Sequence, residues 1–352
     1  MSFEIKDGIL VKYIHTKGTT EITLPDNVTE IKDKALYNCS SLMQIKVNSD
    51  NQTYCDIDGV LFSKDKKTLI LCPDGKSGDY TIPDCVNTIG EEAFEWCVKL
   101  TSITIPKNVT TIKDRAFYNC SSLTQIKVNS DNQTYCDIDG VLFSKDKKKL
   151  ILCPNGKSGK YIIPDSVTTI ASRAFKWCIR LTSIIIPANT TNIENHAFEW
   201  CNSLTEIKVN NDNKMYCDVN GVLFSKDKKV LIFCLRSKSG NYAIPNGVTT
   251  IGNRAFEWCV RLNNITIPDS VINIENHAFE CCCSLNNVTI PNNVIIIGDK
   301  AFYNCISLTD ITIPDSVKHI GSSAFSGCRN LKSVSLPNHF KIFPEQTKLI
   351  YR

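Results

Sequence analysis

The feature that most constrains this chain is a 23-residue unit that recurs along almost its whole length. The unit follows the pattern P-x-x-V-x-x-I-x-x-x-A-F-x-x-C-x-x-L-x-x-I-x-I. It begins at Pro25, Pro83, Pro106, Pro164, Pro187, Pro245, Pro268, Pro291 and Pro314, and starts again at Pro337. Units of this size are typical of solenoids, in which each repeat buries its apolar side chains only against its neighbours. The sequence therefore predicts one continuous array and not a set of separate compact domains.

A longer period is superimposed on the short one. Three steps between successive prolines span 58 residues, because a 35-residue block follows Ile45, Ile126 and Ile207. The length of the block equals one 23-residue unit plus 12 residues, and each block ends on a segment that resembles I-x-I-P. Each block is therefore expected to be an elaborated repeat with a strand of its own, within a super-repeat of 81 residues.

Two local structures are expected within each unit. The segment L-x-x-I-x-I-P alternates apolar and polar residues, which predicts a short strand with one buried face that ends at the proline. Two residues before the Ala-Phe pair, a residue type common at helix N-caps stands in eight of nine units, with Glu91 as the exception. This pattern predicts a single helical turn that buries the alanine and the phenylalanine. The expected strands end at Leu24, Val47, Ile82, Ile105, Val128, Ile163, Ile186, Val209, Ile244, Ile267, Ile290, Ile313 and Leu336, thirteen in all.

The 35-residue blocks carry hairpin signals. Asp58-Gly59, Asp139-Gly140 and Asn220-Gly221 separate alternating apolar runs, as two-residue β-hairpin turns do. Hairpin inserts are expected near 48–79, 129–160 and 210–241, projecting beside the main parallel sheet without breaking it. Residues 1–24 are interpreted as a capping hairpin with the first strand, residues 25–336 as the solenoid, and residues 337–352 as a partial repeat or cap.

The repeat resembles a known family. Units such as Ile-Pro-Asp-Ser-Val-Thr-Thr-Ile at 163–170, followed by Ala-Phe, Cys and Leu, are similar to the BspA-like (Treponema pallidum-type) leucine-rich repeat, as is the Asp-Gly-Val-Leu-Phe-Ser-Lys-Asp segment of the inserts. The resemblance runs from about Phe3 to Leu336. It implies parallel strands on a concave face and turns on a convex face. It also implies a surface or secreted protein that adheres to host or neighbouring-cell proteins, without catalytic residues.

Charge and hydropathy exclude some classes of partner. The net charge is only +4, and the Lys and Arg residues are dispersed, so no basic patch for nucleic acid is expected. No window approaches the eighteen apolar residues of a membrane span, and the first residues lack the pattern of a signal peptide. Cell-surface or secreted placement therefore rests on the family resemblance, and the cytoplasm is the alternative.

The eighteen cysteines follow the repeat period and show no pairing scheme. Nine of them, called the ladder cysteines below, occupy one position of the unit: Cys39, Cys97, Cys120, Cys178, Cys201, Cys259, Cys282, Cys305 and Cys328. Free cysteine is often a core residue, so buried and unbridged thiols are favoured over metal ligands or disulfides between neighbouring strands. Cys281-Cys282-Cys283 lacks a second pair of ligands at zinc-site spacing. No metal or other cofactor is predicted.

The expected function is binding of a protein ligand through the concave face. The middle residue of each I-x-I triplet should point out of the sheet, and the central positions, Lys127, Ile162, Ile185, Lys208 and Ala243, set two isoleucines between two lysines. Simple cross-strand pairing of the isoleucines is the competing interpretation. Trp96, Trp177, Trp200 and Trp258 precede ladder cysteines and are possible contacts on the convex face, or they pack against neighbouring turns. An intracellular interaction scaffold is the alternative function.

Overall fold

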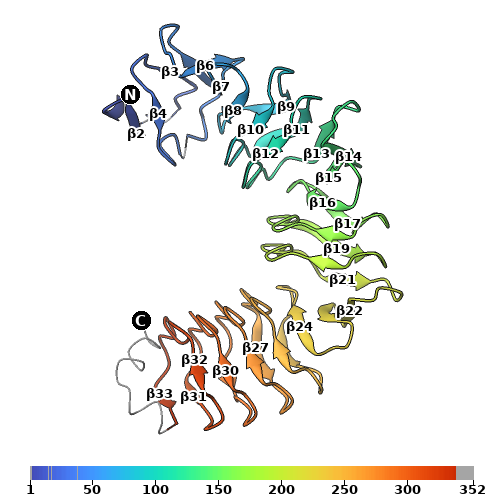
Figure 1. The fold of residues 1–352 in the computed structure, drawn as a ribbon. Coiled ribbons are helices and arrows are strands. Elements are labelled where there is room, and N and C mark those ends of the chain that lie inside the picture. The colour runs from blue at the N-terminus through green and yellow to red at the C-terminus, as the bar shows by residue number, and fades with distance from the viewer. Residues whose placement is uncertain (1, 15, 17, 38, 338–352) are drawn as a thin grey trace. The chain divides into compact units, whose positions relative to one another are not determined.

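The computed structural model describes residues 2–14, 16, 18–37 and 39–337, and in this part of the chain every regular element is a β-strand. The chain divides into two compact units. Met1–Ser158, Ser166–Arg180 and Ile193–Trp200 form the first unit, and Gly159–Asp165, Leu181–Asn192 and Cys201–Arg352 form the second. Each unit is a β-solenoid whose successive coils stack through parallel strands (Figure 1).

One strand of each coil belongs to a series of parallel sheets that we call the long-strand face, because most of its strands have three to seven residues. In the first unit these strands are β3 (Glu21–Leu24), β5 (Gln44–Val47), β9 (Ser77–Thr81), β11 (Lys99–Ile105) and β13 (Gln125–Val128). In the second unit they are β17 (Ser158–Ile162), β19 (Arg180–Ile186), β21 (Glu206–Val209), β25 (Gly240–Ala243), β27 (Leu262–Thr266), β29 (Asn287–Val288), β31 (Asp310–Thr312) and β33 (Ser333–Ser335). The thirteen strands expected from the I-x-I-P spacing are therefore present.

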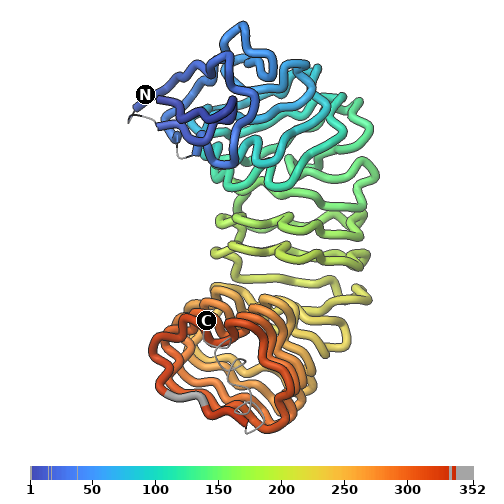
Figure 2. The backbone as a smooth tube through the Cα atoms, turned by 60° about the vertical axis from the view of Figure 1, so that its left-hand side comes forward, coloured from blue at the N-terminus to red at the C-terminus, as the bar shows by residue number. Residues whose placement is uncertain are grey.

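A second, narrower parallel sheet arises where the chain passes through the V-x-x-I segment. Its strands are two residues long, and Thr88 and Ile89 pair with Thr111 and Ile112 of the next coil. They are β10 (Thr88–Ile89), β12 (Thr111–Ile112), β18 (Thr169–Ile170), β20 (Asn192–Ile193), β26 (Thr250–Ile251), β28 (Asn273–Ile274), β30 (Ile296–Ile297) and β32 (His319–Ile320). The coils of the second unit in orange and red show the resulting stack in register (Figure 2).

The core lies inside the coil and consists of columns of identical side chains. In the second unit, Phe256, Phe279, Phe302 and Phe325 stack with ring centroids 5.0, 5.0 and 5.4 Å apart. The alanine, cysteine, leucine and isoleucine positions of the unit form parallel buried columns beside them. Because each column is continued only by the next coil, stability comes from the stacking of neighbours.

The predicted helical turn around Ala-Phe is wrong, since no helix is present in the described residues. In the turns from Ala93 to Ala324, two residues adopt left-handed backbone, the one before the alanine and the one before the ladder cysteine; in one coil these are Glu92 (φ 54°) and Trp96 (φ 61°). Left-handed residues interrupt the α-helical hydrogen-bond pattern. The N–H groups bond instead to the next coil, as in Phe94 N to Ala116 O at 2.8 Å.

The residues interpreted as N-caps also bond to the next coil. Asn276 Oδ1 accepts a hydrogen bond from Asp299 N at 2.8 Å, and Asp299 Oδ1 accepts one from Ser322 N at 2.6 Å. These side chains therefore join equivalent positions of neighbouring repeats and do not cap a turn of their own. We call the layer formed by these turns the turn face.

Each insert contributes an antiparallel hairpin followed by a strand of the narrow sheet. The three sets are β6 (Tyr54–Ile57), β7 (Val60–Ser63) and β8 (Thr68–Leu71); β14 (Tyr135–Ile138), β15 (Val141–Ser144) and β16 (Lys149–Leu152); and β22 (Tyr216–Val219), β23 (Val222–Ser225) and β24 (Val230–Phe233). Within the first set, β6 pairs with β7 and β7 with β8 in antiparallel fashion, and β8 then pairs with β10 in parallel.

The inserts do not simply project beside an unbroken sheet, as the spacing had suggested. Val60, Leu61 and Phe62 of β7 are fully buried, so the hairpin is part of the core. The Asp58-Gly59 turn docks on the long-strand face, where Ile45 N donates to Gly59 O at 2.8 Å. Because the turn takes that donor, β5 and β9 belong to separate sheets; β21 and β25 also belong to separate sheets.

The N-terminal end of the first unit carries one further hairpin. β1 (Ser2–Lys6) pairs with β2 (Ile9–Ile14) in antiparallel fashion, and β2 pairs in parallel with β4 (Glu30–Ile31). Leu10 and Tyr13 are buried against the first coil. Of the partial repeat or cap expected at 337–352, residues 338–352 lie outside the described residues.

Candidate functional site

The long-strand face of the second unit holds three of the five residues expected to form a contact surface. Ile162 is 60% exposed, and Ile163 N of the same strand donates to Ile185 O at 3.1 Å, so the two isoleucines lie on adjacent strands. Ile185 pairs in register with Lys208 of β21. The structure therefore brings Ile162, Ile185 and Lys208 together as a row across β17, β19 and β21.

The other two expected residues lie in different sheets. Lys127 belongs to the first unit, where it pairs with Thr104 of β11. Ala243 begins the last sheet of the second unit and pairs with Thr266. The break at each insert, which sequence reasoning did not anticipate, is the reason for the separation. We call Ile162, Ile185 and Lys208 the isoleucine row.

A charged group borders the isoleucine row. Lys208 Nζ lies 2.9 Å from Glu206 Oε1, and Ser183 Oγ donates to Glu206 Oε2 at 2.8 Å. The ammonium group of Lys208 is exposed to solvent. The exposed Ile162 and the half-buried Ile185, with charged and hydroxyl neighbours, have the composition of a small protein-binding surface with an apolar centre and a polar rim.

The four tryptophans lie on the turn face, each on left-handed backbone. Trp177 and Trp200 stack, with ring centroids 4.9 Å apart and planes 5° from parallel. The Tyr118 ring meets Trp177 edge-on at 6.3 Å, and the Tyr37 ring meets Trp96 in the same way at 6.1 Å. Packing against neighbouring turns therefore accounts for much of their surface, although Trp96 remains 38% exposed. Trp258 lies in the second unit and is partly exposed.

The turn face is interrupted by cavities that the sequence did not predict. An insert has no Ala-Phe turn, because the short segment Cys72–Gly75 leads directly from β8 towards β9. The turns on either side, around Ala35 and Ala93, are therefore separated by one missing turn. A cavity of about 140 Å³ opens between them over β8. A cavity of about 380 Å³ occupies the equivalent place over β16.

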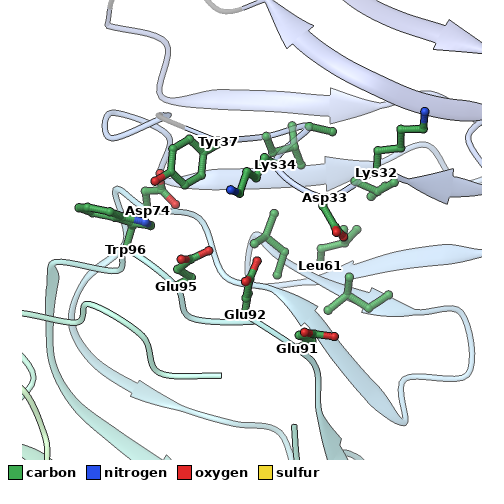
Figure 3. Close-up of a pocket in the computed structure, with 15 residues that line it drawn as sticks. Lys32, Asp33, Lys34, Tyr37, Leu61, Asp74, Glu91, Glu92, Glu95 and Trp96 are labelled. Atoms are coloured by element: carbon green, nitrogen blue, oxygen red, sulfur yellow. The ribbon is translucent and has the colours of Figure 1, made fainter. Parts of the chain in front are cut away.

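The first cavity is acidic and partly aromatic (Figure 3). Its lining includes five carboxylates, two lysines, Tyr37 and Trp96. Burial raises the pKa of Asp74 to about 6, against a hydrogen bond from the backbone of Cys39 that lowers it. Burial, and then the neighbouring Glu92, raise the pKa of Glu95 to about 7. These carboxyl groups therefore lack enough positive charge nearby to offset their partial burial.

The second cavity is lined by cations that have partners. Lys149 Nζ lies 2.8 Å from Glu194 Oε1, and Arg173 lies 3.4 Å from Asp114. Lys176 Nζ lies 2.9 Å from Glu199 Oε2 and 5.1 Å from the centre of the Tyr118 ring. Two equivalent cavities therefore differ in charge, and only the second is balanced by the chain itself.

The ladder cysteines are buried, and most of them donate a hydrogen bond to the preceding coil. Cys120 Sγ donates to Phe94 O at 3.0 Å, and Cys305 Sγ donates to Phe279 O at 3.1 Å. Burial raises the pKa of Cys39 to about 11. A raised pKa keeps a thiol protonated at neutral pH and lowers its reactivity.

Sequence reasoning also missed a buried asparagine at the start of each insert. Asn51, Asn132 and Asn213 are fully enclosed. Asn132 Nδ2 donates to Pro106 O and Val109 O, both at 2.9 Å, and its Oδ1 accepts from Thr134 N and Tyr135 N, both at 2.8 Å. The signal available in the sequence was an asparagine repeated at one offset in all three inserts. The N-x-T sequons at Asn51 and Asn132 are thus structural asparagines.

In the described part of the chain, no group of three or more His, Cys, Asp or Glu side chains is arranged to hold a metal ion. Over the same residues, none of the elements is a helix with the length and hydropathy needed to cross a membrane.

Comparison with known proteins places these features in a family. The model of the "BspA type Leucine rich repeat region (6 copies)" matches residues 12–69, 76–151, 155–218 and 232–347. A leucine rich cell surface protein from Faecalibacterium prausnitzii A2-165 is 28% identical, with a TM-score of 0.52, over 94% of this chain and 82% of that one. A leucine-rich repeat protein from Eubacterium ventriosum ATCC 27560 shares the fold at 22% identity and a TM-score of 0.52, over 84% and 87% of the two chains. No curated protein matches.

The family model covers most of the chain, and the matched segments contain the 23-residue units that build the coils. The chain belongs to the BspA-type leucine-rich repeat family.

Proposed function

We propose that this chain is a non-catalytic recognition protein that binds a protein ligand on a host or neighbouring cell through its long-strand face. The observation that carries the proposal is the isoleucine row, in which the exposed Ile162 lies beside the half-buried Ile185 on the adjacent strand. The equivalent position on other strands of the long-strand face is mainly threonine, as at Thr81 and Thr104. Placement at the cell surface is part of the proposal and draws support from the similarity to a leucine rich cell surface protein.

The chemistry of the row suits a protein contact. Burying two isoleucine side chains removes apolar surface from water, and Lys208 with Glu206 supplies a polar rim that can form charge-assisted hydrogen bonds. Small apolar centres of this kind carry much of the binding free energy in protein interfaces. Replacing both isoleucines by threonine should leave the fold intact, because strands in other sheets of the long-strand face already carry threonine at this position, as at Thr81 and Thr104.

Binding to intact cells tests the proposal directly. The fluorescently labelled chain is expected to bind target cells, and protease treatment of those cells should abolish the binding. The double variant Ile162→Thr, Ile185→Thr should bind about 10–100-fold more weakly, equivalent to about 1–3 kcal/mol. Thr312→Ala, an exposed position on the same face, is the matched control and should bind like the parent. Equal binding by the folded double variant and the parent would place the contact elsewhere.

A second candidate function, an intracellular interaction scaffold, draws on the eighteen free cysteines. Reduced thiols are usual in the cytoplasm, although burial also protects them outside it. Labelling of intact source cells with a membrane-impermeant reagent separates the two candidates. Labelled chain supports surface display, whereas labelling only after lysis supports the scaffold.

A further inference from the structure

We infer that the cavity over β8, lined by Asp74, Glu95, Tyr37 and Trp96, is a binding site for a single basic side chain of a protein partner. The group recognised is a guanidinium or an ammonium. The site lies on the turn face of the first unit, so it is distinct from the isoleucine row and does not depend on the function proposed for it. The argument rests on the cavity itself and on two sister repeats of the same chain.

The third super-repeat shows which chemistry this part of the framework accepts. Asp74 of the segment Cys72-Pro73-Asp74-Gly75 corresponds to Arg236 of Cys234-Leu235-Arg236-Ser237. Likewise, Glu95 corresponds to Glu257. The side chain of Arg236 is 5% exposed, and its Nη2 lies 3.3 Å from Glu257 Oε2. In the third super-repeat the guanidinium of Arg236 therefore contacts the carboxylate of Glu257, which is the equivalent of Glu95 in the first super-repeat.

The second super-repeat places an ammonium in the same region. Lys176 corresponds to Glu95, and Tyr118 corresponds to Tyr37. Lys176 Nζ lies 5.1 Å from the centre of the Tyr118 ring, within the usual range of a cation–π contact. The framework therefore holds a cation in both sister repeats: Arg236 on the carboxylate of Glu257, and Lys176 between the Tyr118 ring and the carboxylate of Glu199.

The first super-repeat keeps the groups that attract a cation and replaces both cations by acids. Asp74 stands where the third super-repeat has Arg236, and Glu95 stands where the second has Lys176. Of the nearby cations, Arg115 pairs with Glu92 at 2.8 Å. Lys34 is exposed, and its Nζ lies 5.9 Å from the centre of the Tyr37 ring. Lys34 is therefore a cation at the rim of the cavity that would compete with the side chain of a partner. The lining as a whole contains five carboxylates and two lysines.

The cavity also suits a side chain in its size and its walls. About 140 Å³ accommodates the end of one arginine or lysine side chain, and the Tyr37 and Trp96 rings can contact its methylene groups and its charge. The raised pKa values of Asp74 and Glu95 agree with this assignment, since an entering cation would favour their ionised forms.

The test uses Nα-acetyl-argininamide, Nα-acetyl-lysinamide and the neutral analogue Nα-acetyl-citrullinamide, with the Trp96 indole N–H followed by NMR on the full chain. Trp96→Phe identifies the signal. Both cationic compounds should shift it saturably, and the citrulline compound should bind at least tenfold more weakly. A capped peptide with one internal arginine should bind as well as the free compound. Binding of the small compounds but not of the peptide would overturn the assignment to a protein side chain.

Substitutions copied from the sister repeats make the test specific. Asp74→Asn, the residue of the second super-repeat, should weaken binding at least fivefold. Glu95→Lys should abolish it, because the chain then fills its own cavity, and Lys34→Gln should strengthen it. Asp84→Asn, which removes an exposed carboxylate of the same unit, should have no effect. Equal losses in Asp84→Asn and Asp74→Asn, or no saturable shift in either the parent or Lys34→Gln, would overturn the inference.

Discussion

Each insert is hydrogen-bonded to the coil before it by one buried asparagine, Asn51, Asn132 or Asn213. Asn132 satisfies two carbonyl groups of the Pro106–Val109 turn and two N–H groups at the start of β14, all with one amide. An amide is suited to this place because it offers donors and acceptors without charge. Its loss would remove four hydrogen bonds to backbone groups that are buried or partly buried.

Asn132→Ala is therefore expected to lower the free energy of unfolding of the first unit by about 2–4 kcal/mol. Urea unfolding followed by tryptophan fluorescence measures it, since three of the four tryptophans lie in that unit. Asn108→Ala is the matched control, because the exposed Asn108 makes a single hydrogen bond to Asp84 O, and it should cost less than about 1 kcal/mol. Equal costs would show that the buried amide is not an anchor.

One buried carboxylate gives the first unit a distinct acid response. Burial opposes ionisation of Glu199, but hydrogen bonds from His196 and Lys176 outweigh it and hold the pKa of Glu199 at about 2. The pKa is depressed on folding, so the stabilisation is present above the ordinary value of 4.5 and is lost as the pH falls towards 2. The contribution is on the order of 2–3 kcal/mol.

Unfolding of the parent and of Glu199→Gln between pH 6 and pH 2 measures this contribution. The parent should lose stability more steeply than the variant on acidification. Glu95→Gln, at the corresponding position of another turn, should behave in the opposite way. Because the pKa of Glu95 is raised in the folded state, its ionisation lowers the free energy of unfolding as the pH rises through about 7. The Glu95→Gln variant should therefore be more stable than the parent at pH 8. Parallel pH profiles for the parent and Glu199→Gln would contradict the assignment.

At the scale of elements, the hairpin turns of the first two inserts are built into the long-strand face, where Ile45 N donates to Gly59 O and Ile126 N donates to Gly140 O. Gly59 has φ +75°, and a Cβ added there would lie 2.9 Å from Gln44 Cγ and 3.1 Å from Gln44 Cα. Gly78 has φ +77° but nothing within 4 Å of an added Cβ. The two glycines therefore share the backbone requirement and differ only in close approach to a neighbouring strand.

Gly59→Ala is expected to cost about 1–3 kcal/mol more than Gly78→Ala, because the added methyl group pushes the turn off β5 in addition to straining the backbone. Thermal unfolding of the two variants beside the parent measures the difference. Equal costs would mean that the hairpin turn is not tightly docked on the sheet.

The sequence predicts some of these elements and not others, for physical reasons. The I-x-I-P alternation fixes which face of each long strand is buried, and the strand spacing follows from the period. The turns around Ala-Phe were misread because residues such as Asp114 and Asn276 are common helix N-caps, and because a bulky residue such as tryptophan rarely adopts the left-handed backbone seen at Trp177. That backbone becomes favourable only when coils stack, because its N–H groups then donate hydrogen bonds to carbonyl groups of the next coil.

The candidate sites show the same division. Alternation correctly placed Ile162 among the exposed residues. Alternation could not show that Lys127 and Ala243 fall in other sheets, because that depends on where Gly59 and its equivalents dock. No sequence motif predicted the cavity over β8, because the cavity arises where a turn is missing between Ala35 and Ala93.

At the scale of the whole molecule, repetition produces many equivalent positions, and recognition must come from the places where they differ. Two differences stand out in the described residues. On the long-strand face of the second unit, isoleucine replaces threonine on two adjacent strands. On the turn face of the first unit, acids replace the cations of the sister repeats. The buried columns of phenylalanine and cysteine supply stability and no distinction between repeats.

Hydroxyl-radical footprinting of the chain, alone and bound to the protein that it captures from target cells, tests the central claim that the isoleucine row is the contact surface. The account predicts that bound partner suppresses oxidation at Ile162 and Ile185. Met215, an exposed side chain of the third insert, should be oxidised equally in both states and serves as the internal reference. Unchanged oxidation at Ile162 together with protection of Trp96, Trp177 or Met215 would contradict the claim.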